Sequence, residues 1–548
     1  MSFLWFTDIL QKYEEDDAPA HEYLAPDGSW TTLTRRQLLT ETRTAAAALT
    51  GAGLRPGDRV ALVAGDPRPF VPAFLGALWA GLVPVPIAPP PLLGRGDAWA
   101  ELLDTVVTAA EPRLLCLDAA QRDQVRAPIP VTAYQELADA LPDGRDPLPA
   151  DPERIAYLQF SSGSTARPRA VAARAGAVLA NATAIVHQGL AVDPAADRAL
   201  SWLPLHHDMG LVGFLFAPLT VGLPVSYLPT NAFVRDPGSW LRAMSERSAT
   251  ITFAPNFAFA LAARRATPER VAALDLSRVR AVGCGGEPVN REALRRFTEA
   301  HAPAGLRPEA VLPCYGLAES TLAVTFHPRG TPLTVRQVST AALDRGTAEP
   351  AADGAPSTEV IGCGRVFRDH ELTVRDEDGR ELPDHAVGEL WVRGPSAARE
   401  YVGDPEATAR TFRPDGWVRT GDRGYLSGGE LFVTGRQKDL LIVRGHNTDP
   451  QRVEWLVEAL PGARLGGVVA CTRPAEETEE LVVVVECRTS AAAELPDLVR
   501  AVVGERLAMA VHDVVPVRPG SIPRTTSGKP RRQETRRRYL EGELARVC

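Results

Sequence analysis

The run SSGSTARPRA at residues 161–170 is the first segment of the sequence whose residue types suit a chemical role. It follows the apolar run 155–160 and precedes a stretch that we expect to be helical. In that position consecutive backbone N–H groups and hydroxyls can hold phosphate oxygens. The segment lacks the GxxxxGK[ST] pattern of a P-loop, so an ordinary turn is the alternative interpretation. The residues concerned are Ser161, Ser162, Gly163, Ser164 and Thr165.

Four further side chains have the chemistry to complete a nucleotide site. In CYGLAEST (314–321), Tyr315 can stack on a base, and Glu319 can reach a Mg²⁺ that offsets phosphate charge. The segment TGD ends in Asp422, a carboxylate of the kind that accepts both hydroxyls of a ribose, and Arg436 follows in GRQKD. The segment TTSGKPRR places Lys529 on a glycine turn, where a mobile cation can be delivered to a transferring phosphate.

The elements that must position these residues are those of an α/β protein. From about residue 58 to 325, short β-branched apolar runs alternate with helical stretches, which is typical of βα units that build parallel sheets. Almost every apolar run ends in a Gly, Ser, Pro or Asn cluster. In open α/β sheets the ligand site lies beyond the carboxyl ends of the strands. We expect strands near Arg59, Leu82, Leu115, Phe160, Tyr227, Phe253, Val282 and Pro313.

The pattern changes after about residue 330. Hairpins predicted at Asp378–Gly379 and Gly428–Gly429 indicate a β-rich subdomain up to about residue 437. From about residue 440 we expect a compact unit with helices near 452–460 and 495–508, and with strands at GGVVAC and ELVVVVEC. A basic tail then holds Arg531, Arg532, Arg536, Arg537 and Arg538. This tail can contact an acidic partner protein or form a solvated helix face.

Composition narrows the classes of function. The 548 residues are 45% hydrophobic and 23% charged, as in ordinary globular proteins. The net charge of −8 disfavours nucleic-acid binding. Seven scattered cysteines without a CxxC pair predict reduced thiols in a cytoplasmic protein, and the early acidic residues do not fit a secretory signal. The apolar run 209–225, broken by Gly and Pro, predicts a buried helix and a strand, not a membrane span.

Lysine is rare in this chain. The sequence has only Lys12, Lys438 and Lys529 among its 60 basic residues. In so arginine-rich a sequence, each retained lysine calls for an explanation.

The ordered set of motifs resembles the adenylate-forming superfamily of acyl-CoA synthetases, adenylation domains and luciferases. The resemblance implies a large N-terminal domain (1–437) with two parallel-type αβ sheets and the β-rich subdomain at about 330–437. A small α+β C-terminal domain (438–548) then swivels about a hinge at Lys438. It also implies ATP and Mg²⁺, with Lys529 as the catalytic lysine and Glu319 and Thr165 at the metal. The implied ATP-binding residues are Ser161, Ser162, Gly163, Ser164, Thr165, Arg169, Gly285, Gly286, Glu287, Tyr315, Gly316, Asp422 and Arg436.

Within that superfamily, the segments 201–213, 251–265, 286–290 and 433–454 look most like fatty acyl-AMP ligases. The segment 321–361 is longer than acyl-CoA synthetases generally use. By the same resemblance, His207 lies near the substrate carboxylate and gates an acyl pocket, although a surface or helix-capping histidine is the alternative. That pocket is expected to involve Phe253, Asn256, Phe257 and Gly210, and the phenylalanines can equally be core. Ala166, Arg169, Ala170, Thr448 and Asp449 depart from the family pattern.

The expected reaction needs no general base, because a carboxylic acid is ionised at neutral pH and can attack the α-phosphate of ATP directly. We expect acyl-AMP and pyrophosphate from a fatty or related apolar acid. Transfer to the phosphopantetheine thiol of an acyl carrier protein follows, in polyketide, nonribosomal peptide or lipid biosynthesis. An acyl-CoA synthetase that transfers to CoA is the second interpretation. A non-catalytic acyl or nucleotide binder is the third.

Overall fold

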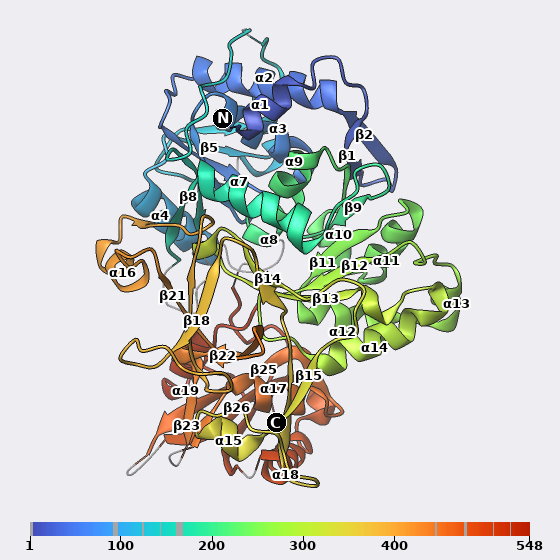
Figure 1. Cartoon of the computed structure of the whole chain (residues 1–548), viewed down its shortest axis with the longest axis vertical. Coiled ribbons are helices and arrows are strands. Elements are labelled where there is room, and N and C mark those ends of the chain that lie inside the picture. The colour runs from blue at the N-terminus through green and yellow to red at the C-terminus, as the bar shows by residue number, and fades with distance from the viewer. Residues whose placement is uncertain are drawn as a thin grey trace.

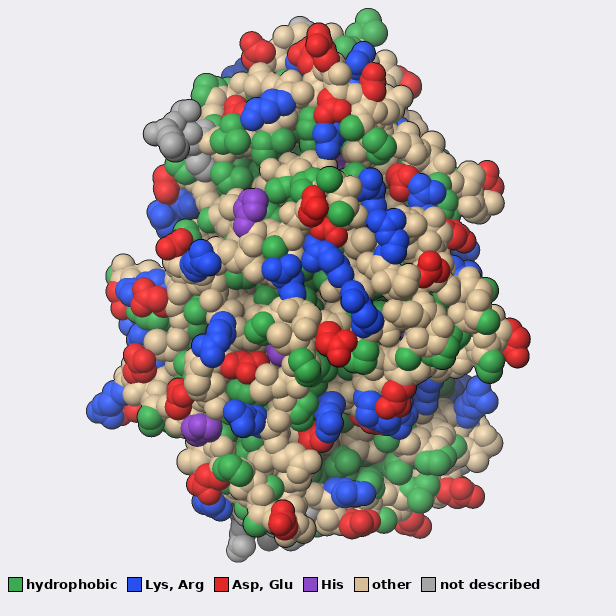
Figure 2. All heavy atoms as spheres, turned by 45° about the vertical axis from the view of Figure 1, so that its right-hand side comes forward, with side chains coloured by type: hydrophobic (Ala, Val, Ile, Leu, Met, Phe, Trp, Pro, Cys, Tyr) green, Lys and Arg blue, Asp and Glu red, His purple; other side chains and the backbone are tan. Residues whose placement is uncertain are grey.

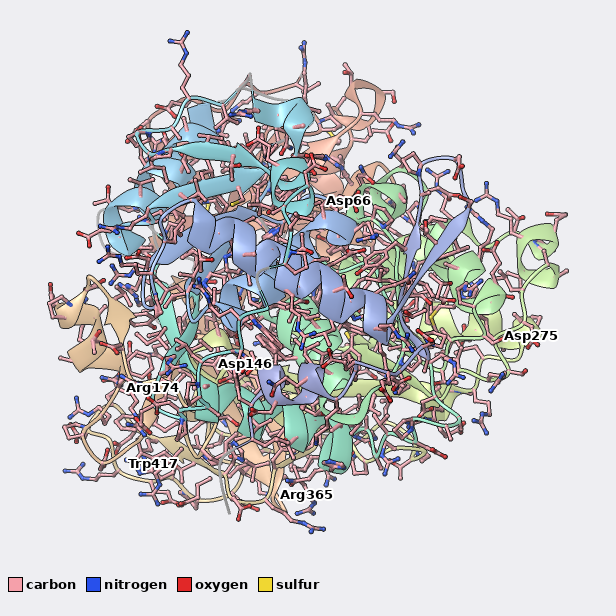
Figure 3. The ribbon with its side chains drawn as sticks, turned by 90° about the horizontal axis from the view of Figure 1, so that it is seen from above. Asp66, Asp146, Arg174, Asp275, Arg365 and Trp417 are labelled. Atoms are coloured by element: carbon pink, nitrogen blue, oxygen red, sulfur yellow. The ribbon has the colours of Figure 1, made fainter. Side chains whose placement is uncertain are left out.

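The computed structural model describes residues 4–90, 97–122, 125–142, 144–160, 168–443, 446–475, 479–507, 509–525 and 528–547. The N-terminal elements lie at the top of the molecule in Figure 1 and the C-terminal elements at the bottom, with the sheets of the middle of the chain between them. Seen from above, the blue helix α2 (Arg35–Gly51) crosses the middle of the view, and Arg174 lies at the side where α16 (Pro405–Thr411) is found (Figure 3).

A nine-stranded sheet forms the centre, in the order β17-β14-β13-β12-β11-β9-β10-β1-β2. The run from β13 to β1 is parallel, whereas β2, β14 and β17 pair antiparallel at the two ends. The carboxyl ends of β9 to β13 therefore meet at one edge. The bounds are β1 Pro19–Leu24, β2 Trp30–Thr34, β9 Ala199–Ser201, β10 Val225–Tyr227, β11 Ile251–Ala254, β12 Ala281–Cys284, β13 Val311–Gly316, β14 Ala323–Phe326 and β17 Arg365–Val366.

A second sheet, in the order β4-β3-β5-β6, is parallel throughout. Its strands are apolar and buried, as expected for a parallel sheet covered by helices on both faces. The bounds are β3 Arg59–Val63, β4 Val83–Ile87, β5 Leu114–Leu117 and β6 Val131–Ala133. The α/β fold with two parallel-type sheets matches the sequence-based expectation, and the predicted strands are found at their expected places.

The segment after β7 (Ile155–Phe160) differs from the prediction. It joins β7 to an antiparallel partner, β8 (Ala170–Arg174), with Phe160 opposite Ala170, and β20 (Tyr401–Val402) completes this sheet. The helix α7 (Ala175–Ala184) begins only after β8. The alanines of β8 favour helix intrinsically, but their burial between two strands overrides that preference.

The helices and short turns of the large part cover these sheets and link their strands. They are α1 Phe6–Gln11, α2, α3 Pro67–Trp79, α4 Asp97–Ala110, α5 Ala119–Arg122, α6 Tyr134–Ala138, α7, η1 Ile185–Gly189, α8 Asp208–Leu211, η2 Val212–Phe216, α9 Ala217–Val221, α10 Thr230–Arg235, α11 Gly238–Glu246, α12 Asn256–Arg265, α13 Pro268–Ala272, α14 Arg291–His301, η3 Ala302–Ala304, η4 Pro308–Ala310 and η5 Ala318–Ser320. The run 209–225 forms the helical turns α8, η2 and α9 and then leads into β10, as predicted. Among the described residues, no helix has the length and apolar character needed to cross a membrane.

The β-rich segment contains a hairpin pair and a four-stranded sheet, β18-β19-β21-β22. The turn at Gly428–Gly429 is confirmed: Ser427 pairs with Glu430, and both glycines have positive φ, as a two-residue hairpin turn requires. The predicted turn at Asp378–Gly379 is also present: Arg375 is bridged antiparallel to Glu381 across it, and Gly379 has positive φ. The longer partner of β18 is β19, which residues 376–387 connect to it. The bounds are β15 Val335–Ser339, α15 Thr340–Asp344, β16 Ser357–Ile361, β18 Glu371–Arg375, β19 Gly388–Arg393, α16, β21 Val418–Ser427 and β22 Glu430–Arg436.

The C-terminal elements build their own sheet, β25-β26-β27, with its own core. Strand alternation explains the two faces: Leu481, Val483 and Val485 pack under the helices α17 and α18, whereas Val482 and Val484 face the side of Tyr539 on α19. The bounds are η6 Gln437–Asp439, β23 Leu441–Val443, β24 His446–Thr448, α17 Pro450–Glu458, β25 Ala463–Pro474, β26 Glu479–Cys487, η7 Thr489–Ala491, α18 Leu495–Leu507, β27 Val511–Val517 and α19 Arg532–Leu540.

Candidate active site

A lysine from the segment between β27 and α19 reaches the edge of the central sheet. The Lys529 ammonium donates a hydrogen bond to the backbone carbonyl of Gly286, in the turn that follows β12. Two segments that are 243 residues apart in sequence are thereby joined.

The turn after β12 depends on the conformation of its glycine. The φ of Gly286 is +84°, in the left-handed region that glycine adopts without strain, so its carbonyl can turn toward the lysine. Gly285 precedes it, and the Glu287 side chain accepts a hydrogen bond from the backbone N–H of Asn256 at 3.2 Å. The turn therefore holds its carboxylate and its carbonyl at the shared edge of β11 and β12.

Tyr315, Asp422 and Arg436 form one hydrogen-bonded group, in which the Tyr315 and Asp422 side chains are buried. The Tyr315 hydroxyl donates to Asp422 Oδ2 at 2.9 Å, and Arg436 Nε donates to Asp422 Oδ1 at 2.8 Å. Burial raises the pKa of Tyr315, so its hydroxyl stays a donor. Each carboxylate oxygen of Asp422 has a second lone pair, so the group can still accept two further hydrogen bonds.

Glu319 lies in η5, directly after β13 and Gly316. The hydroxyl of Tyr401, on β20, donates to Glu319 Oε1 at 2.6 Å. The next residue but one, Thr321, has a φ of +66°, which is unusual for a β-branched residue, and its hydroxyl donates to the Ser396 carbonyl at 2.7 Å. This strained turn fixes the direction in which the Glu319 carboxylate leaves the sheet.

Arg169 lies against the ring of Tyr401. Its guanidinium stands 5.4 Å from the centre of the Tyr401 ring, and its Nε donates to Asp404 Oδ2 at 3.2 Å. Because Tyr401 also contacts Glu319, the arginine and the carboxylate belong to one cluster. The predicted phosphate-binding residues Ser161, Ser162, Gly163, Ser164 and Thr165 lie outside the described residues, as does Ala166.

The electrostatic surroundings of Lys529 are mixed. Burial lowers its pKa, and Arg436 acts in the same direction, whereas Glu287, Asp208 and Asp422 raise it. Burial also raises the pKa of Asp208. The lysine therefore lies near Glu287, Asp422 and Arg436, which the sequence assigned to the same site.

A second layer of residues that the sequence did not single out holds the Lys529 turn. Arg524 donates to the carbonyls of Gly528 at 3.0 Å and Gly466 at 2.6 Å, and it pairs with Glu486 at 3.4 Å. The Glu486 side chain is fully buried. The motif TTSGKPRR contained no sign of this network, because Glu486 and Gly466 come from the neighbouring strands β26 and β25.

Comparison with known proteins places this geometry in a family. Residues 10–402 match the model of the AMP-binding enzymes. The chain belongs to this family. FadD26 of Mycobacterium marinum, a long-chain-fatty-acid–AMP ligase, is 37% identical over 96% of this chain and 94% of the relative. A Caulobacter vibrioides protein with the provisional name acyl-CoA synthetase is 39% identical over 89% of this chain and 87% of its own length.

A solved structure extends the likeness to the whole fold. It comes from studies of fatty acyl-adenylate ligases of E. coli and L. pneumophila, has a TM-score of 0.91 at 33% identity, and covers 99% of this chain and 98% of that one. The resemblance to adenylate-forming enzymes, and to fatty acyl-AMP ligases among them, is thereby confirmed.

In this AMP-binding enzyme, Lys438 lies in η6, between the β-rich sheet and the C-terminal sheet. Partial burial and the neighbouring Arg169, Arg410 and Arg436 lower its pKa. The next residue, Asp439, pairs with Arg532 of α19 at 3.0 Å. The segment around Lys438 thus connects directly to the C-terminal elements.

The residues expected at an acyl pocket separate into two groups. Phe253 lines an apolar cavity between β11 and the turns α8 and η2. Gly210, Asn256 and Phe257 do not line that cavity. Gly210 packs against the Pro204 carbonyl, the Asn256 side chain binds the Pro288 carbonyl at 2.7 Å, and Phe257 packs against aromatic rings. Each of the three is held by its own neighbours, and their place in an acyl pocket stays a prediction.

His207 occupies the N-cap position of α8, and its ring lies 4.4 Å from that of His206. The His206 carbonyl accepts from Gln159 Nε2 at 2.7 Å, which ties this turn to β7 next to the predicted phosphate loop. His207 therefore lies on a turn that is tied to β7. It stands at the N-cap position of α8, but its side chain makes no capping hydrogen bond.

The arginines of α19 are largely engaged within the chain. Arg536 pairs with Glu479 at 3.3 Å, and Arg537 and Arg538 pair with Glu534 at 2.9 Å. On the face shown in Figure 2, acidic and basic side chains are interspersed. These ion pairs favour the solvated-helix interpretation of the basic tail over the partner-binding one.

Proposed function

We propose that this protein is a fatty acyl-AMP ligase, which activates a fatty or related apolar carboxylic acid with ATP. The single observation that carries the proposal is the contact of Lys529 with the Gly286 carbonyl, beside the Tyr315, Asp422 and Arg436 group. The near full-length likeness to fatty acyl-AMP ligases supports it.

The reaction is a displacement at phosphorus. One oxygen of the ionised acid forms a bond to the α-phosphorus, the bond from that phosphorus to the bridging β-oxygen breaks, and pyrophosphate leaves with the electron pair. No proton moves, so positioning and charge neutralisation suffice. In our proposal Lys529 supplies positive charge between the acid carboxylate and the α-phosphate, and His207 lies by the carboxylate.

The remaining residues hold the nucleotide. Tyr315 and Gly316 line the base, and Asp422 with Arg436 holds the ribose. Gly285, Gly286 and Glu287 form the wall on the other side of the nucleotide. The phosphates are bound by Arg169 and by the hydroxyls and N–H groups of Ser161, Ser162, Gly163, Ser164 and Thr165.

Magnesium fits the residues that are present. Glu319 offers a hard oxygen donor, and Thr165 is the second predicted ligand. The described residues contain no group of three or more His, Cys, Asp or Glu side chains able to hold a metal. One carboxylate combined with substrate phosphates is the usual arrangement for this ion. When bound, Mg²⁺ supplies charge neutralisation for the phosphates.

The acyl group then passes to a thiol, and we propose the phosphopantetheine thiol of an acyl carrier protein, in the cytoplasm. The thiol sulfur bonds to the acyl carbon, AMP leaves, and the thiol proton is released. A swivel of residues 438–548 about Lys438, relative to residues 1–437, would withdraw Lys529. The separate core of the C-terminal sheet supports such a rigid-body motion. Transfer to CoA is the second candidate, which the name of the Caulobacter relative favours.

The test supplies the purified full chain with ATP, Mg²⁺ and acids of increasing chain length, and offers either CoA or a phosphopantetheinylated carrier protein. Mass spectrometry follows acyl-AMP, acyl-CoA and acylated carrier. We expect acyl-AMP, then acylated carrier without acyl-CoA. Lys529→Ala should slow adenylate formation by about 100- to 1000-fold, the cost typical of one lost transition-state donor. Lys12→Ala, at an exposed lysine, is the matched control. Abundant acyl-CoA would establish the second candidate, and an unaffected Lys529→Ala would refute the assigned role.

A further inference from the structure

A strained turn follows Glu319 directly. Thr321 has a φ of +66° and a ψ of −58°, the conformation of a rare type of γ-turn that is unfavourable for a β-branched residue. The turn closes through a hydrogen bond from the Leu322 N–H to the Ser320 carbonyl at 2.8 Å. Thr321 is only 2% exposed. A strained conformation of this kind persists only where the surrounding structure holds it, and such conformations cluster at functional sites.

The segment that leads into β20 holds this turn at three points. The Ser396 carbonyl accepts a hydrogen bond from the Thr321 hydroxyl at 2.7 Å. The backbone N–H of Ala398 donates to the Glu319 carbonyl at 2.9 Å, and the Tyr401 hydroxyl donates to the Glu319 carboxylate at 2.6 Å. Both the backbone and the side chain of Glu319 are therefore fixed by this one segment.

A buried histidine fixes Ser396, which is itself fully buried. His370 Nε2 lies 2.7 Å from the Ser396 hydroxyl, and His370 Nδ1 lies 3.0 Å from the Arg368 carbonyl. Because a carbonyl can only accept, Nδ1 carries the proton and Nε2 accepts from the serine hydroxyl. Burial lowers the pKa of His370, which favours this neutral form of the ring. Every hydrogen bond from the Arg368 carbonyl to Thr321 therefore has a defined donor and acceptor.

The central sheet anchors this histidine. The Phe367 N–H donates to the Val324 carbonyl of β14 at 3.1 Å, and the His370 N–H donates to the Phe367 carbonyl at 3.2 Å. On its other side the ring lies against Gly394, where a Cβ would come within 2.5 Å of His370 Cδ2. The absence of a side chain on Gly394 therefore allows the ring to reach Ser396.

We propose that Thr321, Ser396 and His370 are positioning residues, which aim the Glu319 carboxylate at the Mg²⁺ that accompanies ATP. The inference rests on the proposed function, which assigns Glu319 to the metal. The three residues act through the turn that follows Glu319 and do not contact the substrate. The inference also accounts for the residue type at the strained position. Glycine would adopt this φ without strain, but it has no hydroxyl to bind the Ser396 carbonyl.

The experiment measures binding without catalysis. Calorimetry gives the dissociation constant of an ATP analogue with a methylene bridge between the α- and β-phosphates, once with Mn²⁺ and once with a chelator. Thr321→Val, Thr321→Gly and Ser396→Ala should each weaken binding with Mn²⁺ about tenfold, as is typical for lost partners of a metal ligand, and change binding without metal by less than about twofold. Thr321→Ser, which keeps the hydroxyl, should retain the wild-type affinity. The double variant Thr321→Val with Ser396→Ala should lose no more than the weaker-binding single variant, because both act in one chain of contacts.

Thr325→Val is the matched control. Thr325 is also fully buried, on β14, and its hydroxyl also donates to a backbone carbonyl, that of Cys363, at 2.6 Å. Loss of this hydroxyl should lower Tm as Thr321→Val does, but it should leave the effect of Mn²⁺ on nucleotide binding unchanged. A general loss of stability is thereby separated from misplacement of Glu319.

The outcomes separate this inference from the proposed function. If the wild-type chain forms no adenylate with any acid but binds the analogue more tightly with Mn²⁺, the proposed function fails, and the variants still decide the inference. A wild-type affinity that Mn²⁺ does not increase would overturn the inference, because Glu319 would then not be at a metal. Wild-type affinity with Mn²⁺ in both Thr321→Gly and Ser396→Ala would also overturn it. Thr321→Gly keeps the test decisive if Thr321→Val does not fold, since glycine adopts the turn without strain.

Discussion

Arg524 positions the turn that carries Lys529, and Arg524→Met is the sharpest test of that role. Methionine keeps most of the aliphatic volume but removes the donors to the Gly528 and Gly466 carbonyls and the ion pair with Glu486. Glu486 keeps its hydrogen bonds from Arg464, at 2.7 Å, and from two backbone N–H groups. The substitution therefore does not leave a buried carboxylate without partners.

The magnitude follows from the contacts that are lost. Hydrogen bonds that involve a charged partner contribute about 1.5–3 kcal/mol each. The Arg524 side chain is 28% exposed, so water replaces part of what the carbonyls lose. We expect the free energy of unfolding to fall by about 2 kcal/mol. A displacement of about 1 Å at Lys529 should slow adenylation by about 100-fold, because reacting groups tolerate little misplacement.

The assay is pyrophosphate release under saturating ATP and acid, at a temperature where thermal unfolding shows the variant to be folded. Arg464→Met is the control, because Arg464 pairs with the same Glu486 but does not touch the Lys529 turn. Arg524→Lys, which retains one donor group, should recover part of the rate. The KM values should change much less than kcat.

A double-mutant cycle distinguishes positioning from general destabilisation. In a Lys529→Ala background, Arg524→Met should slow the residual reaction by less than about threefold, since no lysine is left to misplace. If Arg524→Met slows that background by the same factor as it slows the wild-type chain, the positioning role is refuted.

Two further predictions concern charge. Burial and neighbouring carboxylates raise the pKa of Glu458 from 4.5 to about 8, so this group takes up a proton on folding, and its contribution to stability is full below about pH 4.5 and is lost as the pH rises through about 8. Glu458→Gln should therefore flatten the fall in Tm over that range, whereas Glu505→Gln at an exposed site should not; a parallel fall in the Glu458 variant would contradict the assignment. Asp422→Asn, which removes the carboxylate charge beside Arg436, should raise the KM for ATP at least about tenfold in the pyrophosphate assay, and an unchanged KM would remove Asp422 from the nucleotide site.

Sequence patterns located most of the central elements correctly. The runs near Leu115, Phe253 and Val282 form short strands that are buried along their whole length, and short apolar runs of this kind can be recognised in sequence without tertiary information. The hairpin turn at Gly428–Gly429 could equally be predicted from the sequence, because such a turn requires positive φ at both of its residues.

Sequence patterns gave the wrong result where tertiary contacts outweighed the intrinsic secondary-structure preference of the residues. The alanines of β8 predicted helix, and only their place between β7 and β20 makes them a strand. Phe253 and Phe257 look alike in sequence. Phe253 lines the cavity, whereas Phe257 packs on Trp202. The two residues are of the same type, so only their surroundings make them differ.

The sequence by itself determined the chemistry available to this protein: a base-stacking ring in Tyr315, a carboxylate in Asp422 and a lysine at position 529 in a chain that uses arginine nearly everywhere else. Only the tertiary structure decided which of these groups meet. It brought Lys529 to Gly286 and gave Glu319 its partner Tyr401. The physical reason is that motif chemistry is local to a few residues, whereas contacts between distant segments depend on how whole sheets and helices pack.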